Sequence, residues 1–233
     1  QAFTAALRQA IKPIWTDGVS VTGELLAFAL LVVALHTGRN NTPLLEMGRN
    51  CLRPHPKDDT VFLVLWKRRG YNTSKVALRA ESDVERHLES TPSVRTSVER
   101  LIRRVMVLTE PLDTEAPADL KGRVWLYRTR ASKSVGNVTA LNSSAVAVAV
   151  TRLVARYSLT DSDGEPLRIN ISRLRKTFAS GIFELTGGDA ATTAAALGNT
   201  VQIIDQHYLA PSEVSRRNWQ FMGEILVQVL LTR

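Results

Sequence analysis

The chain has 233 residues, 44% of them hydrophobic and 22% charged, so it can bury a core and is not disordered throughout. An excess of 30 Lys and Arg over 22 Asp and Glu gives a net charge of +8, which favours a polyanionic partner, either nucleic acid or an anionic membrane surface. One cysteine excludes a disulfide framework. Because no apolar run is long enough to span a bilayer and no export signal opens the sequence, we expect a cytoplasmic protein with no membrane-spanning segment.

The N-terminal segment is predicted to be helical. Residues 1–18 indicate a short helix and a loop, because Pro13 and Gly18 interrupt them. Residues 19–37 contain the stretch LLAFALLVVAL, which is apolar on all sides and is typical of a buried central helix. Gly38 is expected to end that helix.

A β-hairpin is predicted next. Residues 39–60 contain three prolines and indicate a short helix followed by a loop. The segments 61–67 and 74–78 are rich in β-forming residues and flank a turn with a glycine and an asparagine. This pattern predicts two antiparallel strands.

Further helices are predicted downstream. Residues 82–108 carry an apolar stripe with helical spacing, whereas 110–119 carry four acids and two prolines and indicate an exposed loop. The segment 123–130 fits either a strand or the start of a helix. The alternation AVAVAV at 145–150 fits a strand, but the longer apolar pattern over 141–157 fits a helix, which we prefer. The remaining predictions are a loop at 161–166, helices at 171–186 and 189–197 separated by Gly187–Gly188, and a C-terminal helix at 212–231.

These elements predict a fold that is mainly α with a small antiparallel β-sheet. We expect one domain over 1–233, in which 1–18 form an opening segment and 212–233 a C-terminal helix. The four histidines are far apart and form no metal-ligand pair, and no nucleotide-binding loop is present. We therefore expect no metal and no cofactor.

The most informative stretch lies at 172–208. It reads Ser-Arg-Leu-Arg-Lys-Thr-Phe-Ala from Ser172, then Leu-Gly-Asn ending at Asn199, then Tyr208 nine residues later. This order resembles the tyrosine recombinase (phage integrase) family, whose pattern is His-x-Leu-Arg-His-Thr-Phe-Ala, Leu-Gly-His and a tyrosine nine residues on. The resemblance places Arg175 at the family's arginine of this box.

Two upstream segments extend the resemblance to residues 19–230. Thr-Gly-Arg ending at Arg39 resembles the family's Thr-Gly-x-Arg box, which follows a buried helix. The hairpin at 61–78 resembles the family's lysine-bearing hairpin, with Lys67 as its lysine. The order Arg, Lys, Arg, Tyr also agrees with the family.

The resemblance implies the fold of the family's catalytic domain and strand cleavage through a 3′-phosphotyrosyl intermediate without a metal. A tyrosine hydroxyl can attack a phosphodiester and conserve the bond energy for resealing. Two arginines can stabilise the charge on phosphate, and a lysine can protonate the departing sugar oxygen. Tyr208, Arg39, Arg175 and Lys67 match these roles. The other hairpin cations, Arg68, Arg69 and Lys75, remain alternatives to Lys67 as a phosphate contact.

Several positions depart from the family pattern. Arg39 follows the glycine directly and Asn40 occupies the expected register, but we assign Arg39 because asparagine carries no charge. Ser172 replaces a histidine, and it could instead be the N-cap of its helix. Asn199 replaces a histidine or tryptophan and can hydrogen-bond a phosphate oxygen, or it can serve as a turn residue. We keep Ser172 and Asn199 as site residues.

The expected function is therefore that of a site-specific DNA recombinase or integrase of a mobile element, acting on double-stranded DNA. Only 18 residues precede the first core helix, so we expect the family's N-terminal core-binding domain to be absent from this chain. In the family a homotetramer assembles on DNA through the C-terminal helix, and here the apolar face of 212–231 could dock on a neighbour or pack on its own chain. Two alternatives remain: a non-catalytic DNA-binding accessory protein, and a DNA-relaxing enzyme like type IB topoisomerases.

Overall fold

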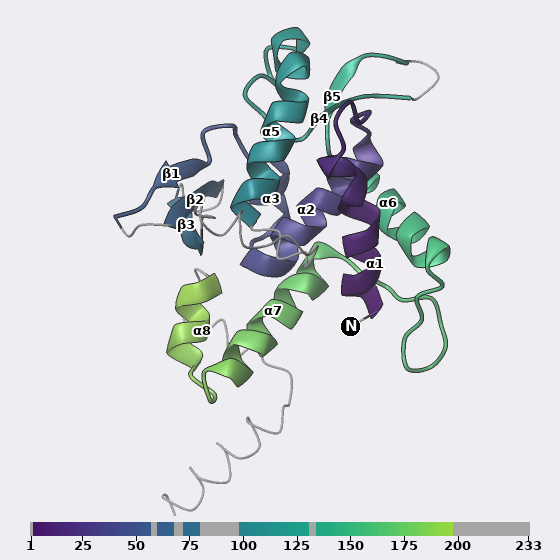
Figure 1. Ribbon diagram of the computed structural model, residues 1–233. Helices are drawn as coiled ribbons and strands as arrows, with labels where there is room; N and C mark the ends of the chain where they lie inside the picture. The colour runs from purple at the N-terminus through teal and green to yellow at the C-terminus, as the bar shows by residue number, and fades with distance from the viewer. Residues whose placement is uncertain (1, 57–59, 68–71, 80–97, 131–133, 198–233) are drawn as a thin grey trace, which may run out of the picture.

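The computed structural model describes residues 2–56, 60–67, 72–79, 98–130 and 134–197. In these ranges helices surround the central helix α2, and the strands form two small antiparallel sheets (Figure 1). The predicted fold class, mainly α with a small antiparallel sheet, is confirmed. Within the same ranges no helix is both long and apolar enough to cross a membrane.

The helix α2 spans Gly23–Thr37 and is buried over almost its whole length. It begins four residues later than predicted because Thr22 is its N-cap and accepts a hydrogen bond from the Leu25 amide at 3.2 Å. It ends as predicted at Gly38, whose left-handed φ of 59° suits glycine. The long helices that pack on α2 are α1 (Ala2–Ile11), α5 (Val98–Glu115), α6 (Ser143–Arg156) and α7 (Ile171–Leu185).

The predicted hairpin is confirmed as β2 (Thr60–Lys67) and β3 (Asn72–Arg79), which pair along their full length. The segment before it was predicted to be a short helix and a loop. The helix is present as α3 (Asn41–Leu45), but Leu52–Pro54 form an additional edge strand, β1, on β2. An edge strand tolerates the proline at its end, because a proline there leaves no ladder hydrogen bond unmade.

The prediction of an exposed loop at 110–119 is wrong for its first half. The helix α5 continues through Pro111 to Glu115, and Leu112 and Ala116 are buried against Leu126. Burial of these apolar side chains outweighs the hydrogen bond that the proline removes. The segment 123–130 contains strand β4 (Leu126–Arg128), which pairs with β5 (Val138–Ala140).

The C-terminal part of the described chain agrees with the predictions. The preferred helix at 145–150 is confirmed within α6. The helices α7 and α8 (Ala190–Leu197) are separated by Gly187 and Gly188, both with positive φ. The predicted helix at 212–231 and residues 80–97 lie outside the described residues.

Candidate active site

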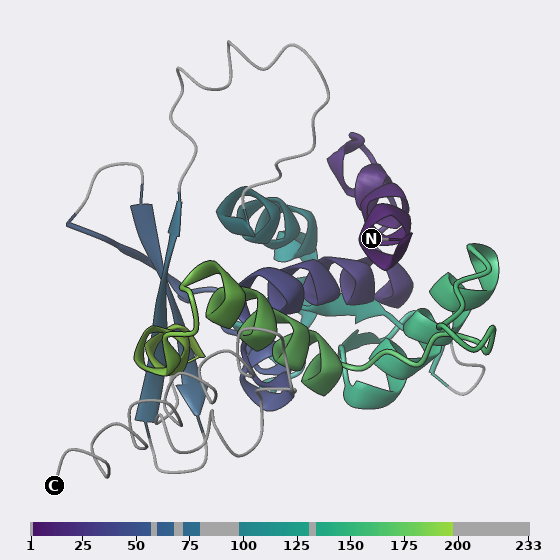
Figure 2. The same cartoon turned by 90° about the horizontal axis from the view of Figure 1, so that it is seen from below.

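The two arginines of the sequence motifs come from different helix ends and meet at one place. Arg39 follows Gly38 at the C-terminus of α2, and Arg175 lies in the second turn of α7. The two helices run side by side (Figure 2), and the C-terminal end of α2 lies next to the first half of α7. Both residues are only 3% exposed. Asn40, the alternative at the first box, is exposed and precedes α3.

Hydrogen bonds to backbone carbonyls define the position of both guanidinium groups. Arg39 donates from Nη1 to the Leu197 carbonyl at 3.4 Å and from Nη2 to the Ala196 carbonyl at 3.1 Å. Arg175 donates from Nη2 to the same Leu197 carbonyl at 3.2 Å and from Nη1 to the Gly38 carbonyl. One carbonyl oxygen therefore accepts from both cations. The C-terminal ends of α2 and α8 carry partial negative charge, which favours two cations at this place.

The proximity of two cations has an electrostatic consequence. Burial, and then the charge of Arg175, lower the pKa of Arg39 to about 10. The Arg39 guanidinium is still protonated at pH 7, because that pKa lies well above neutrality. The arrangement concentrates two positive charges at one point, and an anion with several oxygens such as a phosphate would complement it.

Close packing around Gly38 holds the end of α2, the middle of α7 and the end of α8 together. A Cβ atom at Gly38 would lie 2.4 Å from Cδ1 of Phe178 in α7 and 2.9 Å from Cδ2 of Leu197 in α8. Glycine is therefore required here both for its backbone conformation and for the approach of α7 and α8. The same contacts position the carbonyl oxygens that accept hydrogen bonds from Arg39 and Arg175.

We expect the Gly38→Ala substitution to lower the free energy of unfolding by roughly 2–4 kcal/mol. About 1 kcal/mol comes from the left-handed backbone, and about 1–3 kcal/mol from overpacking against Phe178 and Leu197. Urea denaturation measures the change. Gly122→Ala is the matched control, because Gly122 has a φ of 76° and a Cβ atom there would meet no atom within 4 Å. An equal loss of unfolding free energy in Gly38→Ala and Gly122→Ala would show that packing at Gly38 contributes nothing to stability.

Ser172 lies at the second position of α7, one turn before Arg175, and its side chain is exposed. The possibility that Ser172 caps this helix is wrong. The N-cap is Asn170, whose Oδ1 accepts a hydrogen bond from the Arg173 amide at 2.9 Å. An asparagine just before the first apolar residue of the helix is an ordinary cap signal, and it could have been found from the sequence.

The remaining candidate residues are described in part or not at all. Lys67 is the last residue of β2, and its backbone pairs with Asn72. Asn199 and Tyr208 lie outside the described residues. Within the described ranges, no three His, Cys, Asp or Glu side chains gather as metal ligands would.

Sequence reasoning missed the carbonyls of Gly38, Ala196 and Leu197 as partners of the arginines. Backbone groups leave no residue-type signal. The general rule that the last carbonyls of a helix need external donors was the available hint, because both Gly38 and Leu197 were predicted helix ends.

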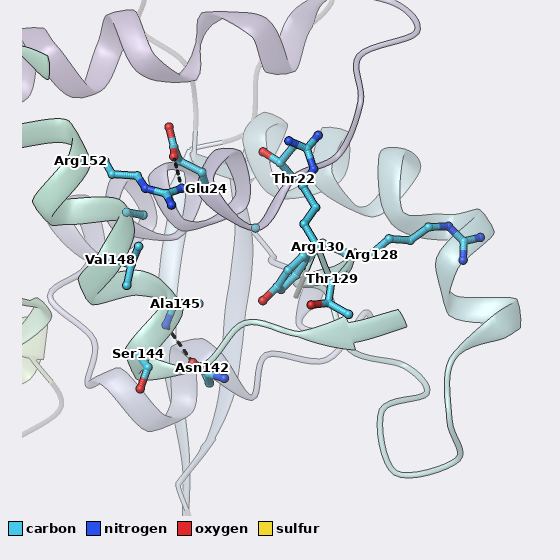
Figure 3. A pocket seen from close by; sticks show the side chains of 13 residues that line it. Thr22, Glu24, Arg128, Thr129, Arg130, Asn142, Ser144, Ala145, Val148 and Arg152 are labelled. Carbon is cyan, nitrogen blue, oxygen red and sulfur yellow. Dashed lines mark hydrogen bonds and ion pairs between the residues drawn. The ribbon is translucent and has the colours of Figure 1, made fainter. Parts of the chain in front are cut away.

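A pocket of about 630 Å³ lies at the other end of α2, roughly 22 Å from the arginine pair for a 15-residue helix. The N-terminus of α2, the end of β4 and the first half of α6 line it (Figure 3). Arg152 in this pocket is paired with Glu24 at 3.1 Å, and Arg128 is paired with Glu115 at 2.7 Å. Arg130 is exposed and extends toward Thr22.

Comparison with solved structures finds proteins of the same fold. The XerH site-specific recombinase bound to difH substrate in a pre-cleavage complex matches with a TM-score of 0.53 and 14% identity, over 93% of this chain and 52% of that one. The XerA recombinase matches with a TM-score of 0.52 and 12% identity, over 94% of this chain and 62% of that one. The Tn1549 transposon integrase in complex with transposon right-end DNA matches with a TM-score of 0.50 and 13% identity, over 94% of this chain and 64% of that one.

The chain thus spans about half to two thirds of the length of these proteins, and the low identities establish likeness of fold. No family model matches the sequence, and a search of curated proteins finds no match.

Proposed function

The chain has the fold of a tyrosine recombinase catalytic domain, and on that basis we propose that it cleaves and rejoins double-stranded DNA through a 3′-phosphotyrosyl intermediate. The observation that carries the proposal is the convergence of Arg39 and Arg175. These residues lie 136 positions apart (175 − 39), yet both donate to the Leu197 carbonyl. Two arginines at one point can hold the same phosphodiester through several charge-assisted hydrogen bonds.

Tyr208 is the proposed nucleophile. It lies 11 positions after Leu197 (208 − 197), whose carbonyl oxygen accepts hydrogen bonds from both arginines. A short length of chain therefore joins Tyr208 to the arginine pair. A phenol ionises with a pKa near 10, and adjacent positive charge favours the phenolate. Asn199 lies on the same connecting segment, and in this proposal it hydrogen-bonds a phosphate oxygen.

Lys67 is the proposed general acid. Strand positions of the same parity share a face of a sheet, and position 67 shares its parity with Leu63 and Leu65, which are buried in the core. Position 75 pairs with Val64 and therefore belongs to the opposite face. This register favours Lys67 over Lys75, and Arg68 and Arg69 lie outside the described residues. Ser172, exposed one turn before Arg175, is a further phosphate contact in this proposal.

The reaction balances without an external energy source. The Tyr208 phenol gives its proton to solvent, its oxygen forms a bond to phosphorus, and the bond from phosphorus to the 5′ oxygen breaks. Lys67 gives a proton to that departing oxygen, and the 3′-phosphotyrosyl link retains the bond energy. Attack by a 5′ hydroxyl of the same or a partner strand reverses the steps and releases the tyrosine.

An assay with nicked suicide duplexes of randomised flanking sequence separates the proposal from its alternatives. Recombinase chemistry predicts a covalent protein–DNA adduct and strand exchange between duplexes. Relaxation of supercoiled DNA without strand exchange would instead indicate an enzyme like type IB topoisomerases. DNA binding without any adduct would indicate the non-catalytic accessory protein.

The basic pocket at the N-terminus of α2 is the proposed second contact with the DNA backbone. Lining arginines and hydroxyl groups suit a phosphate, and its distance from the arginine pair allows one duplex to reach both. In this proposal a homotetramer forms on DNA through the apolar face of 212–231. Of these contacts, Arg130 offers the most direct test because its side chain is exposed.

We expect the Arg130→Ala variant to bind duplex DNA more weakly and with a smaller salt dependence. Loss of one phosphate contact lowers the slope of log Kobs against log salt by about 0.9, because one fewer counterion is released. Fluorescence anisotropy over a salt series measures the slope. Lys121→Ala removes one exposed charge from the segment between α5 and β4 and is the matched control. Identical slopes for the two variants would contradict a contact at Arg130.

A further inference from the structure

Among the described residues, α8 has a small apolar contact of its own with α7, and its last residue also packs at Gly38. Its buried residues Ala194 and Leu197 form a cluster with Ala179 and Phe178 of α7, separate from the main core. Within the described ranges α8 thus has few buried apolar contacts, which favours a low free energy of local opening. The helix also lies apart from the central bundle, at the end of α7 beneath the three-stranded sheet (Figure 1).

The connection between α7 and α8 is a glycine C-cap, in which the Gly187 amide donates to the Glu184 carbonyl at 3.1 Å and the Gly188 amide to the Phe183 carbonyl at 2.8 Å. Two adjacent glycines can also act as a hinge, because their backbone dihedral angles are the least restricted. Gly187 and Gly188 have φ values of 66° and 95°, and a Cβ atom at Gly187 would meet no atom within 4 Å. Glycine is therefore needed at Gly187 for its backbone alone. Directly after the hinge, the Asp189 carboxylate accepts from the Ala191 amide at 2.8 Å and the Thr192 amide at 3.2 Å, so α8 begins as a capped unit.

The last turn of α8 occupies hydrogen-bond donors of the arginine pair. The carbonyls of Ala196 and Leu197 take three donor groups from Arg39 and Arg175, and both arginines are 3% exposed. A phosphate approaching from solvent meets buried guanidinium groups whose Nη atoms already donate to backbone carbonyls. Access to them requires the last turn of α8 to move.

We propose that α8 is a hinged cover of the arginine pair, which turns about Gly187–Gly188 and is displaced when a phosphate group takes over the donors held by its last carbonyls. The exchange is favourable because hydrogen bonds from a guanidinium to phosphate are stronger than those to a neutral carbonyl. Phosphate also offsets the repulsion between Arg39 and Arg175, which after burial is the second cause of the lowered pKa of Arg39. The inference rests on the proposed function, since it concerns the phosphate site of that reaction.

A hinge variant tests the cover without touching the arginines or the carbonyls. Gly187→Ala strains the covered state through its backbone, so the uncovered population is expected to rise about fivefold, the factor that corresponds to ~1 kcal/mol. Asparagine tolerates a left-handed backbone better than alanine does. The uncovered population of Gly187→Asn should therefore lie between that of Gly187→Ala and that of the unmodified protein. Gly122→Ala is the matched control, with the same kind of strain far from α8 along the chain.

Two measurements on the full chain give the readout. Phenylglyoxal labels accessible arginines, and mass spectrometry reports the labelling rates of Arg39 and Arg175 in each variant. Amide hydrogen exchange of residues 190–197 is then followed with and without inorganic phosphate. We expect about fivefold faster labelling of both arginines in Gly187→Ala only, and faster exchange of 190–197 when phosphate is added.

Equal labelling in Gly187→Ala and Gly122→Ala would overturn the inference, as would unchanged or slower exchange of 190–197 with phosphate. The adduct assay keeps this outcome distinct from failure of the proposed function. If the adduct forms but the labelling rates of Arg39 and Arg175 do not change, the cover alone is rejected. A response of the arginines without any adduct rejects the proposed chemistry and keeps the cover.

Discussion

The Arg175→Ala variant is expected to lose about 10³-fold in the rate of adduct formation at saturating DNA. Its guanidinium is a preorganised donor beside the reacting phosphate, and removal of such a donor typically costs that much. The variant should also lose roughly 2–3 kcal/mol of stability, because the carbonyls of Gly38 and Leu197 lose a charged partner. Single-turnover kinetics on a suicide duplex and urea denaturation separate the two effects.

Two further substitutions define what Arg175 contributes. Arg175→Lys keeps the charge but cannot bridge two acceptors with a planar group, so an intermediate rate is expected. Lys176→Ala removes the exposed cation next to it on α7 and should leave the rate at saturating DNA within a few-fold of the unmodified protein. A catalytic rate that is equally low in the alanine variants of Arg175 and Lys176 would contradict a special role for the buried arginine.

The Tyr208→Phe variant is expected to form no covalent adduct while binding DNA with unchanged affinity. Phenylalanine keeps the ring and removes only the oxygen that attacks phosphorus. Denaturing gel electrophoresis with a labelled suicide duplex measures the adduct, and anisotropy measures binding. Tyr157→Phe, which removes a hydroxyl from the C-cap of α6, should retain full adduct formation. An adduct that persists in Tyr208→Phe would reject Tyr208 as the nucleophile.

The sequence predicted those elements whose signals are local. The apolar run of α2, the stop at Gly38 and the glycine pair between α7 and α8 all follow from the conformational needs of single residues. The hairpin followed from two runs of β-forming residues around a turn. In each case the local preference and the final packing agree.

Errors arose where packing overrides the local signal. Pro111 and four acids indicated a loop at 110–119, yet Leu112 and Ala116 are buried and α5 continues. The edge strand Leu52–Pro54 forms because it pairs with the edge of β2 opposite β3, and no local sequence pattern reveals that pairing. Such contacts depend on which segments meet in space.

The candidate site shows the same division. The residue types and spacing singled out Arg39 and Arg175, and the structure brings both to the Leu197 carbonyl. The sequence did not reveal that α8 supplies this carbonyl or that both arginines are buried beneath it, because backbone acceptors have no residue signature. The cover was therefore found only from the three-dimensional contacts.

Identification of the residue linked to DNA is the most direct test of the proposed chemistry. The full chain is trapped on a pool of nicked suicide duplexes with randomised flanks, the adduct is digested, and the nucleotide-bearing peptide is sequenced by mass spectrometry. We expect a 3′-phosphoryl nucleotide on the Tyr208 oxygen. A nucleotide on another residue or on the opposite strand end, or the absence of any adduct from a pool that the protein binds, would contradict cleavage by Tyr208.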